Sequence, residues 1–171
     1  LSIESSKPGY LYVIDQEQYS DGSKGDPYLI FPTTRMREGN NRVEPGLLVE
    51  LPDQNDRPNY WTLTRQRPDE VSENLTLLVA PKPIAEIRPS RQPIKLSRDL
   101  LKEWQSKWEV QAQHLELEGG AGTQWTEQEK SAGAGGTRML TQDDPSPQTV
   151  YRVNPKPGNP ILVRVPLKIG G

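Results

Sequence analysis

Residues 9–33 read GYLYVIDQEQYSDGSKGDPYLIFPT, and this stretch decides the fold of the chain. It holds two runs of aromatic and aliphatic residues, Tyr10–Ile14 and Tyr28–Phe31, of the kind that favours β-strands. Because the first run is apolar on both faces, it predicts a central strand that is covered on both sides. Residues 15–26 between the runs are polar and contain Asp and Gly turn residues, so we expect a loop there.

Further strand signals follow along the chain. Residues 40–53 (NNRVEPGLLVELPD) contain a third run, and residues 60–64 and 75–79 supply two more. Short runs separated by turn residues are typical of antiparallel sandwiches and barrels. Residues 149–153 and 161–165 are also strand-like, and the Pro and Gly residues between them predict a closing hairpin.

One helix is predicted over residues 97–112. Ser97 is a suitable N-cap, and a stripe of apolar residues recurs at helical spacing after it, at Leu100, Leu101, Trp104, Trp108 and Ala112. We expect this amphipathic helix to pack on the sheet and to bury both tryptophans in the core. The fold class is therefore predicted as mainly β, an antiparallel β-sandwich or partly closed barrel with one helix packed on it.

The length of 171 residues suits a single domain over residues 1–171. Its hydrophobic fraction of 32% is low, so we expect a modest core within many turns and loops. We divide it into a β framework (1–80), a Pro-rich connector (81–96), the helix (97–112), a Gly-rich loop region (118–148) and the closing hairpin (149–169). Because the chain begins with Leu1, we also expect it to be a piece of a longer precursor.

The composition of the chain argues against several classes of partner and functional site. The formal net charge of −2 argues against nucleic acid as a partner. Cysteine is absent, which excludes disulfides, thiol catalysis and Cys-ligated metals. No apolar run reaches the length of a membrane span, so we expect no membrane insertion. Residues 82–107 are net basic and residues 111–144 net acidic, which indicates either solvated faces or a docking surface for an acidic partner.

The motifs of common enzymes and metal sites are absent from the sequence. His114 is the sole histidine and lacks a G-x-S-x-G nucleophile setting. The loop over residues 21–26 lacks the spacing of a calcium-binding EF-hand, and the Gly-rich segments lack the P-loop lysine. We therefore predict no catalytic residue, no metal and no cofactor. A carboxylate-based hydrolase that uses Glu116 and Glu118 is the enzymatic alternative, although alternation predicts that both acids lie on an exposed strand face.

Aromatic residues give the one binding hypothesis. Tyr28, Tyr60 and Trp61 would form a platform for a glycan or an extended peptide if they are exposed, and they would belong to the core if they are buried. The leading prediction is a non-enzymatic interaction or sensing module with an unknown protein or glycan partner. The other alternative is a structural segment of a larger envelope protein, in which residues 2–6 would form an unpaired edge strand.

Four segments of the first third resemble a bacterial domain of unknown function, family 4384. They are GYLYVI (9–14), SDG (20–22), LIFP (29–32) and NRVEPGLLVELPD (41–53). The later EGGAG, WTEQE, AGAGGTR, LTQDDP and QTVYRV segments resemble a longer subset of the family. The resemblance implies an accessory domain, attached to caspase-like peptidase or protein kinase domains or to exported envelope proteins. It implies an extracytoplasmic location (periplasm, envelope or secreted) and carries over no catalytic residue.

Overall fold

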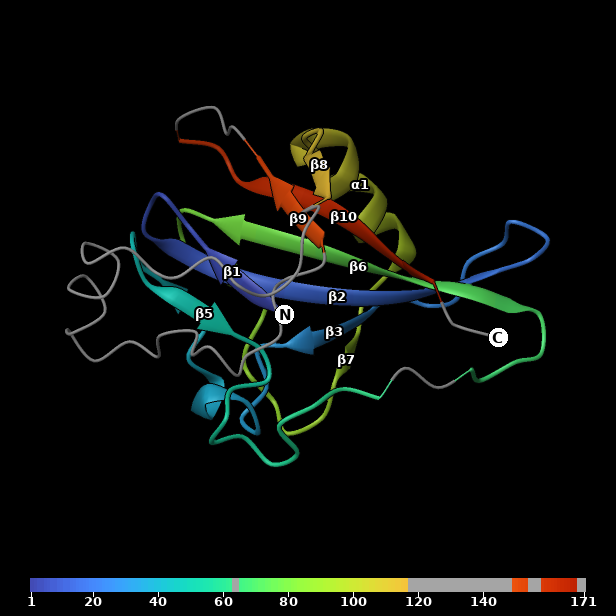
Figure 1. Cartoon of the computed structure of the whole chain (residues 1–171), viewed down its shortest axis with the longest axis horizontal. Coiled ribbons are helices and arrows are strands. Elements are labelled where there is room, and N and C mark those ends of the chain that lie inside the picture. Colours follow the sequence, from blue (N-terminus) through green and yellow to red (C-terminus); the bar gives the residue numbers. More distant parts are fainter. Residues whose placement is uncertain (63–64, 117–148, 154–157, 169–171) are drawn as a thin grey trace. The chain divides into compact units, whose positions relative to one another are not determined.

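The computed structural model describes residues 1–62, 65–116, 149–153 and 158–168 (Figure 1). The chain divides into two compact units, one of Leu1–Val110 with Pro155–Gly171 and the other of Gln111–Asn154. The fold is mainly β, with antiparallel sheets and one α-helix, as the sequence predicts. The described strands form no closed barrel, which leaves the sandwich-like alternative.

A six-stranded antiparallel sheet forms the centre of the first unit. Five strands follow the order β10-β6-β2-β3-β7, and β4 pairs with the beginning of β2. The bounds are β2 (Gly9–Tyr19), β3 (Tyr28–Phe31), β4 (Arg42–Val43), β6 (Glu70–Ala80), β7 (Ile94–Lys95) and β10 (Ile161–Lys168). The Pro-rich connector therefore ends in a short strand, β7, which pairs with β3.

Strand β2 is longer than the sequence predicts. It continues through residues 15–19, which we expected to form a loop, because β6 supplies a paired strand along this whole length. The pairing runs from Tyr10 opposite Ala80 to Tyr19 opposite Glu70. Leu11, Tyr12, Val13 and Ile14 are all at most 2% exposed, so the prediction of a strand covered on both faces is confirmed.

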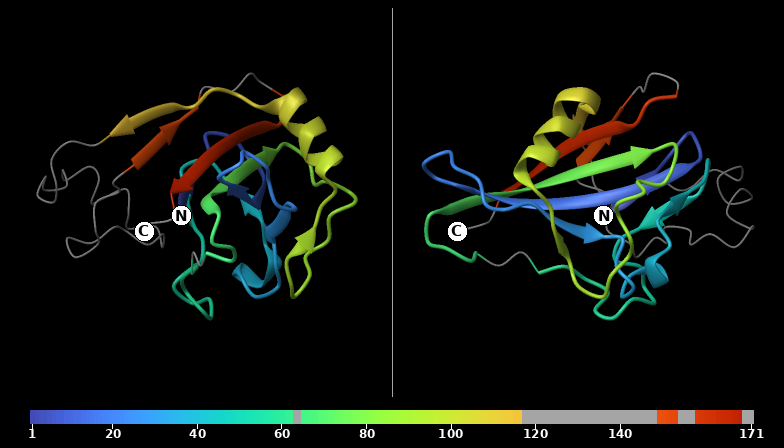
Figure 2. Two further views of the ribbon diagram at one scale, coloured as in Figure 1. Left: turned by 90° about the vertical axis from the view of Figure 1, so that its right-hand side faces the viewer. Right: turned by 180° about the vertical axis from the view of Figure 1, so that it is seen from behind.

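Helix α1 (Arg98–Trp108) covers one face of this sheet (Figure 2). The Ser97 hydroxyl accepts a hydrogen bond from the Leu100 backbone N–H at 3.0 Å, which confirms the predicted N-cap. The helix ends before the predicted residue 112, because Glu109 is extended and the Val110 N–H donates to the Leu162 carbonyl of β10 at 3.0 Å. The buried cluster under the helix consists of Tyr12, Ile14, Leu29, Leu78, Ala80, Leu96, Leu101, Trp104 and Leu162.

The two helix tryptophans stack on each other, with ring centroids 5.9 Å apart. Trp104 is 5% exposed, as predicted, whereas Trp108 is only partly buried and packs against the edge of the cluster. In β6, which contains the predicted strand over residues 75–79, Leu75 and Leu78 are buried, whereas Leu77 and Val79 are partly exposed.

The other face of the sheet is covered by the segment between β3 and β6. It contains the 3-10 helix η1 (Arg37–Gly39) and β5 (Leu48–Glu50), which pairs with β1 (Ser2–Glu4) in a separate two-stranded antiparallel sheet. Figure 2 shows this segment and α1 on opposite sides of the central sheet. Tyr60–Thr62, which we expected to begin a strand, is not a strand and follows the bends of residues 53–59.

The tail strands take other partners than those predicted. β10 pairs with β6 along all eight of its residues, and β9 (Thr149–Arg152) pairs with β8 (Gln113–Glu116) in the second unit. The expected closing hairpin over residues 149–169 is therefore wrong, because the long edge of β6 offers β10 a complete ladder. The Gly-rich loop region over residues 118–148 lies outside the described residues.

Truncation of Leu101 tests the packing of α1 on the sheet. This side chain is 2% exposed, so we expect Leu101→Ala to lower the free energy of unfolding by about 2–5 kcal/mol through lost burial and the cavity it leaves. Leu47→Ala is the matched control, because Leu47 is 45% exposed, and it should change stability by less than about 0.5 kcal/mol. Urea unfolding measures both, and equal effects would contradict the described core.

Candidate functional site

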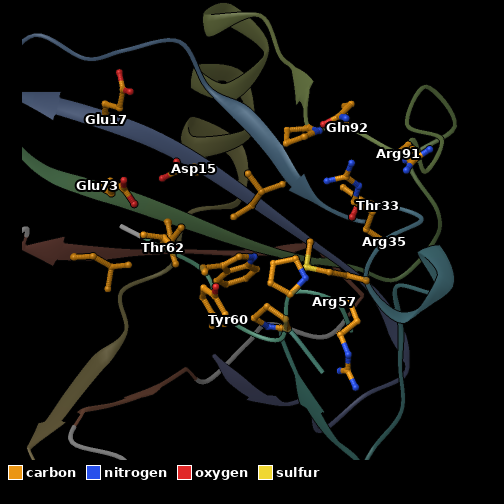
Figure 3. Close-up of a pocket in the computed structure, with 18 of the residues that line it drawn as sticks. Asp15, Glu17, Thr33, Arg35, Arg57, Tyr60, Thr62, Glu73, Arg91 and Gln92 are labelled. Carbon is orange, nitrogen blue, oxygen red and sulfur yellow. The ribbon is translucent and has the colours of Figure 1, made fainter. Parts of the chain in front are cut away.

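A cavity of about 350 Å³ lies on the face of the central sheet opposite α1 (Figure 3). Its floor is formed by side chains of four strands: Asp15 and Glu17 of β2, Ile30 of β3, Glu73 and Leu75 of β6, and Leu167 of β10. These residues share one face because the register places Asp15 opposite Leu75 and Glu17 opposite Glu73, and successive side chains alternate between faces.

Three loop segments form the walls of the cavity. The segment after β3 contributes Thr33, Arg35 and Met36; the segment before β6 contributes Pro52, Arg57, Pro58, Tyr60, Trp61, Thr62 and Gln66; and the segment before β7 contributes Arg91, Gln92 and Pro93. The central sheet therefore forms the floor of the site, and three separate loop segments form its walls.

Asp56 fixes the wall that carries the aromatic residues. Its carboxylate is 8% exposed and accepts hydrogen bonds from the backbone N–H groups of Arg37 (2.9 Å) and Asp53 (2.7 Å). The Arg57 guanidinium then donates to the backbone carbonyls of Gln54 (2.9 Å) and Asp56 (2.8 Å). Hydrogen bonds to charged groups are among the stronger ones, so this loop is held by its own side chains.

Four carboxylates gather at this end of the β2–β6 pair, and two of them have specific partners. Glu17 accepts a hydrogen bond from the Tyr19 hydroxyl, and the Arg67 guanidinium lies 4.1 Å from the centroid of the Tyr19 ring. Glu70 is 1% exposed and accepts a hydrogen bond from the Gln66 backbone N–H at 2.7 Å, although its other oxygen is buried and has no partner in the part of the chain that the structure describes.

The other two carboxylates, Asp15 and Glu73, are less well compensated. One oxygen of Asp15 is buried and has no hydrogen-bond partner among the described residues. Glu73 is 8% exposed, and within the part of the chain that the structure describes its carboxylate has no hydrogen bond or ion pair. Buried polar groups are nearly always hydrogen-bonded in folded proteins, so these two side chains call for an explanation.

The pKa of Asp15 is raised to about 6, mainly by burial and in smaller part by the nearby charges of Glu17 and Glu70, while the hydrogen bond from the Gln16 backbone N–H opposes the shift. Burial likewise raises the pKa of Glu73 to about 7, with added repulsion from Asp15, Glu70 and Glu17. Both acids therefore titrate close to neutral pH, which is a property of many functional carboxylates and of some structural ones.

The opposite side of the cavity is basic. Arg35, Arg57 and Arg91 line it, and Figure 3 shows the three acids on the sheet strands and the three arginines on the surrounding loops. Arg35 and Arg91 are exposed, so their charges are well solvated, while Arg57 is engaged with its own loop. The cavity therefore has a buried acidic side and a solvated basic side.

The structure brings together two of the three predicted binding residues. Tyr60 (63% exposed) and Trp61 (half-buried) line the cavity. Tyr28 is 42% exposed on β3 and is not among the lining residues. None of the three is fully buried, so the alternative of core packing is wrong for Tyr28 and Tyr60.

The carboxylates of the predicted hydrolase are not described. Glu116 lies in β8, where only the backbone is described, and Glu118 lies outside the described residues; the side chain of His114 is not described either. The acids that the structure does bring together, Asp15, Glu17 and Glu73, were missed because residues 15–19 have the composition of a solvated loop. The available signal was the alternation of Asp15, Glu17 and Tyr19 directly after the apolar run.

Within residues 1–62, 65–116, 149–153 and 158–168, no group of three or more acidic or histidine side chains is arranged to hold a metal ion. In the same ranges no helix has the length and apolar character needed to cross a membrane.

The two raised pKa values predict a pH-dependent stability. Between about pH 4 and pH 7 the unfolded state releases the protons of Asp15 and Glu73 while the folded state retains them, so the stability they contribute falls as the pH rises through this window. In the unmodified protein the free energy of unfolding should therefore be lower at pH 8 than at pH 5. We expect Glu73→Gln to reduce this difference by on the order of 1–2 kcal/mol.

Urea unfolding at pH 5 and pH 8 measures this difference, with Glu103→Gln as the control, because Glu103 is exposed on α1 and paired with Lys107. The control should keep the pH dependence of the unmodified protein. The same pH dependence in Glu73→Gln would show that Glu73 titrates normally.

No protein-family model, curated protein or solved structure matches this chain, so the resemblance to family 4384 stays a prediction and the site is interpreted from its own geometry.

Proposed function

We propose that this chain is a non-enzymatic ligand-binding module, an interaction or sensing domain whose binding site is the cavity between the central sheet and the Tyr60–Thr62 wall. The observation that carries the proposal is the combination, in one cavity, of the exposed Tyr60, the half-buried Trp61 and the carboxylate of Glu73, which has no hydrogen bond or ion pair within the described residues. Ligand sites are typically concave, largely apolar and equipped with a few polar groups that orient the ligand.

The dimensions and lining of the cavity support this proposal. Its volume of about 350 Å³ lies within the roughly 300–1,000 Å³ of small-molecule sites. Proline, aromatic and aliphatic side chains supply apolar contact, and the charged groups stand at its two sides. A side chain of a partner protein or part of a glycan would also fit this volume, in keeping with the protein or glycan partner that we expect.

The biological setting follows from the resemblance in the sequence. A bacterial accessory domain of an exported or multidomain protein would present this site to a ligand outside the cytoplasm, next to whatever effector domain it accompanies. We therefore propose an extracytoplasmic binding or sensing role. The other non-enzymatic alternative, a purely structural segment of a larger envelope protein, predicts an unpaired edge strand over residues 2–6, whereas Ser2–Glu4 pairs with β5.

A fragment screen tests the binding role. We expect at least one class among small amines, carboxylates, monosaccharides and tripeptides to shift the Trp61 indole N–H resonance in ¹H–¹⁵N NMR spectra, because Trp61 lines the cavity. Tyr60→Ala should weaken that binding severalfold through loss of aromatic contact. Tyr28→Ala is the matched control, since Tyr28 is also exposed but lies outside the lining, and it should have no effect.

Two results would count against the binding role. The first is a screen in which no class shifts the Trp61 resonance. The second is equal weakening by Tyr60→Ala and Tyr28→Ala, which would place the ligand elsewhere.

One observation favours a carboxylate-based hydrolase as the second candidate. Asp15 and Glu73 line the same cavity and have raised pKa values, and a protonated acid beside an ionised one is the arrangement of general acid catalysis. In this hydrolase hypothesis the catalytic acids are Asp15 and Glu73, which line one cavity, and no longer Glu116 and Glu118.

Hydrolysis of 4-nitrophenyl glycosides tests that candidate. An enzyme of this type should show a bell-shaped pH profile between about pH 6 and pH 7, and Asp15→Asn should remove most of the activity, by a factor of about 100 or more. Release of nitrophenol at the uncatalysed rate by the unmodified protein across a panel of sugars would favour the binding role.

A further inference from the structure

We infer that the cavity binds a ligand through a single alkylammonium group, which enters beside Asp15 and Glu73 with its carbon chain against the apolar and aromatic lining. This inference rests on the proposed binding role and names the chemical class of the ligand. The ammonium group could belong to a free amine or to a lysine side chain of a partner protein, which share the same chemistry.

The first step of the argument is the state of Glu73. It is 8% exposed, it lines the cavity, and within the described residues it has no hydrogen bond or ion pair. The Glu73 oxygens are not among the fully enclosed atoms, so they are accessible from the cavity, and a cation that enters beside them supplies a compensating charge and hydrogen-bond donors. An ammonium group offers three N–H donors, which suits acceptor-only carboxylates.

The second step is that the remaining acceptor capacity lies at the same place. Asp15 has a buried oxygen without a partner, and it interacts electrostatically with Glu73 across the β2–β6 pair. Glu17 and Glu70 add negative charge but already accept hydrogen bonds from Tyr19 and from the Gln66 backbone N–H. Glu70 also has one buried oxygen without a partner among the described residues, but it does not line the cavity, so the free acceptors at the cavity belong to Asp15 and Glu73.

The third step concerns the walls. Tyr60 and Trp61 line the same cavity, and aromatic faces attract alkylammonium groups and pack against alkyl chains. Ile30, Leu75 and Leu167 complete an apolar floor around the acids. Because apolar side chains of the floor lie beside the acids, a strongly hydrated inorganic cation is a poor fit, whereas an amine with a carbon chain fits both parts of the surface.

The fourth step explains why a single ammonium group is inferred. Arg35, Arg57 and Arg91 line the other side of the cavity, where a second cation would meet like charges. Two of these guanidinium groups are exposed and free to meet solvent or an anionic tail. The arrangement favours a ligand with one cationic end and a neutral or anionic remainder.

Binding of a cation should release protons. The charged groups that face the ammonium position are Asp15 and Glu17 of β2 and Glu70 and Glu73 of β6, while β10 contributes the apolar Leu167 and the loops contribute the three arginines. With pKa values of about 6 and about 7, Asp15 and Glu73 are partly protonated in the free protein at neutral pH. A bound cation favours the ionised forms, so affinity should rise by about tenfold from pH 6 to pH 8 if one proton with a pKa near 7 must leave.

Three probes of equal chain length test the ligand class: pentylamine, pentanoate and pentan-1-ol, titrated at pH 8 with the Trp61 indole N–H as the reporter. We expect saturable binding of pentylamine with a Kd on the order of millimolar, as suits so small a ligand, and far weaker binding of the other two. Nα-acetyl-lysine amide represents a lysine side chain of a partner protein. It should bind in the same cavity if the natural ligand is such a lysine.

Variants locate the ammonium group. Glu73→Gln and Asp15→Asn should each raise the Kd of pentylamine by about tenfold or more and should reduce its pH dependence. Glu103→Gln, an exposed acid of α1, should leave the Kd unchanged. Two cavity variants are used so that misfolding of one, detected by circular dichroism, still leaves a valid test in the other.

The outcomes separate this inference from the proposed function. Binding of pentanoate or pentan-1-ol at Trp61 without pentylamine would overturn the cationic ligand and leave the binding role intact. Failure of every probe, together with a blank fragment screen, would overturn both. Binding of pentylamine that is unaffected by Glu73→Gln and Asp15→Asn would also overturn the inference.

Discussion

The pairing of β2 with β6 is the constraint on which the rest of the structure depends. Its register sets two surfaces at once, because alternate residues of a strand point to opposite faces of the sheet. Tyr12 and Ile14 enter the cluster under α1, while Asp15 and Glu17 reach the cavity on the other face. A slip of one residue would bring the carboxylates into the cluster around Trp104, so burial of the apolar face enforces the position of the acids. The core and the candidate site are therefore specified by the same set of backbone hydrogen bonds.

The apolar half of β2 and the start of α1 were predictable, and the polar half of β2 was not. Apolar periodicity identifies a strand or helix from its own residues, and Ser97 marks the helix start through a local hydrogen bond. Residues 15–19 offer no such signal, because they become a strand only through their partner, residues 70–75, more than fifty positions later. That partner is itself polar at Glu70, Glu73 and Asn74, so both halves have the composition of loops. Tyr60 and Trp61 were predicted as binding residues from their type alone, but the acids opposite them required the long-range pairing.

The electrostatics of the cavity follow from the same pairing. Two antiparallel polar segments bring Asp15, Glu17, Glu70 and Glu73 into mutual repulsion, and the chain compensates only part of it, through Tyr19 and the Gln66 backbone N–H. The remaining cost is expressed in the raised pKa values of Asp15 and Glu73. Strongly perturbed pKa values cluster at functional sites, so these two acids are the candidates for a functional role in the cavity.

The two faces of the central sheet give the strongest argument against a purely structural role. On the face that carries the cavity, Val13 lies opposite Leu77, and the next pairs along the same face are Asp15 with Leu75 and Glu17 with Glu73. A scaffold would gain stability by continuing the apolar pattern of the first pair. The α1 face also becomes polar beyond Ile14, at Gln16 opposite Asn74, but both of these amides are uncharged and donate hydrogen bonds, to the Gly25 carbonyl and to the Gln18 side chain. Instead the pattern changes to carboxylates at the point where the loops withdraw from the sheet and leave a cavity lined by Tyr60 and Trp61. A change from packed hydrocarbon to uncompensated charge, at a place where the described chain leaves a cavity of about 350 Å³, is the arrangement expected of a surface kept for a ligand.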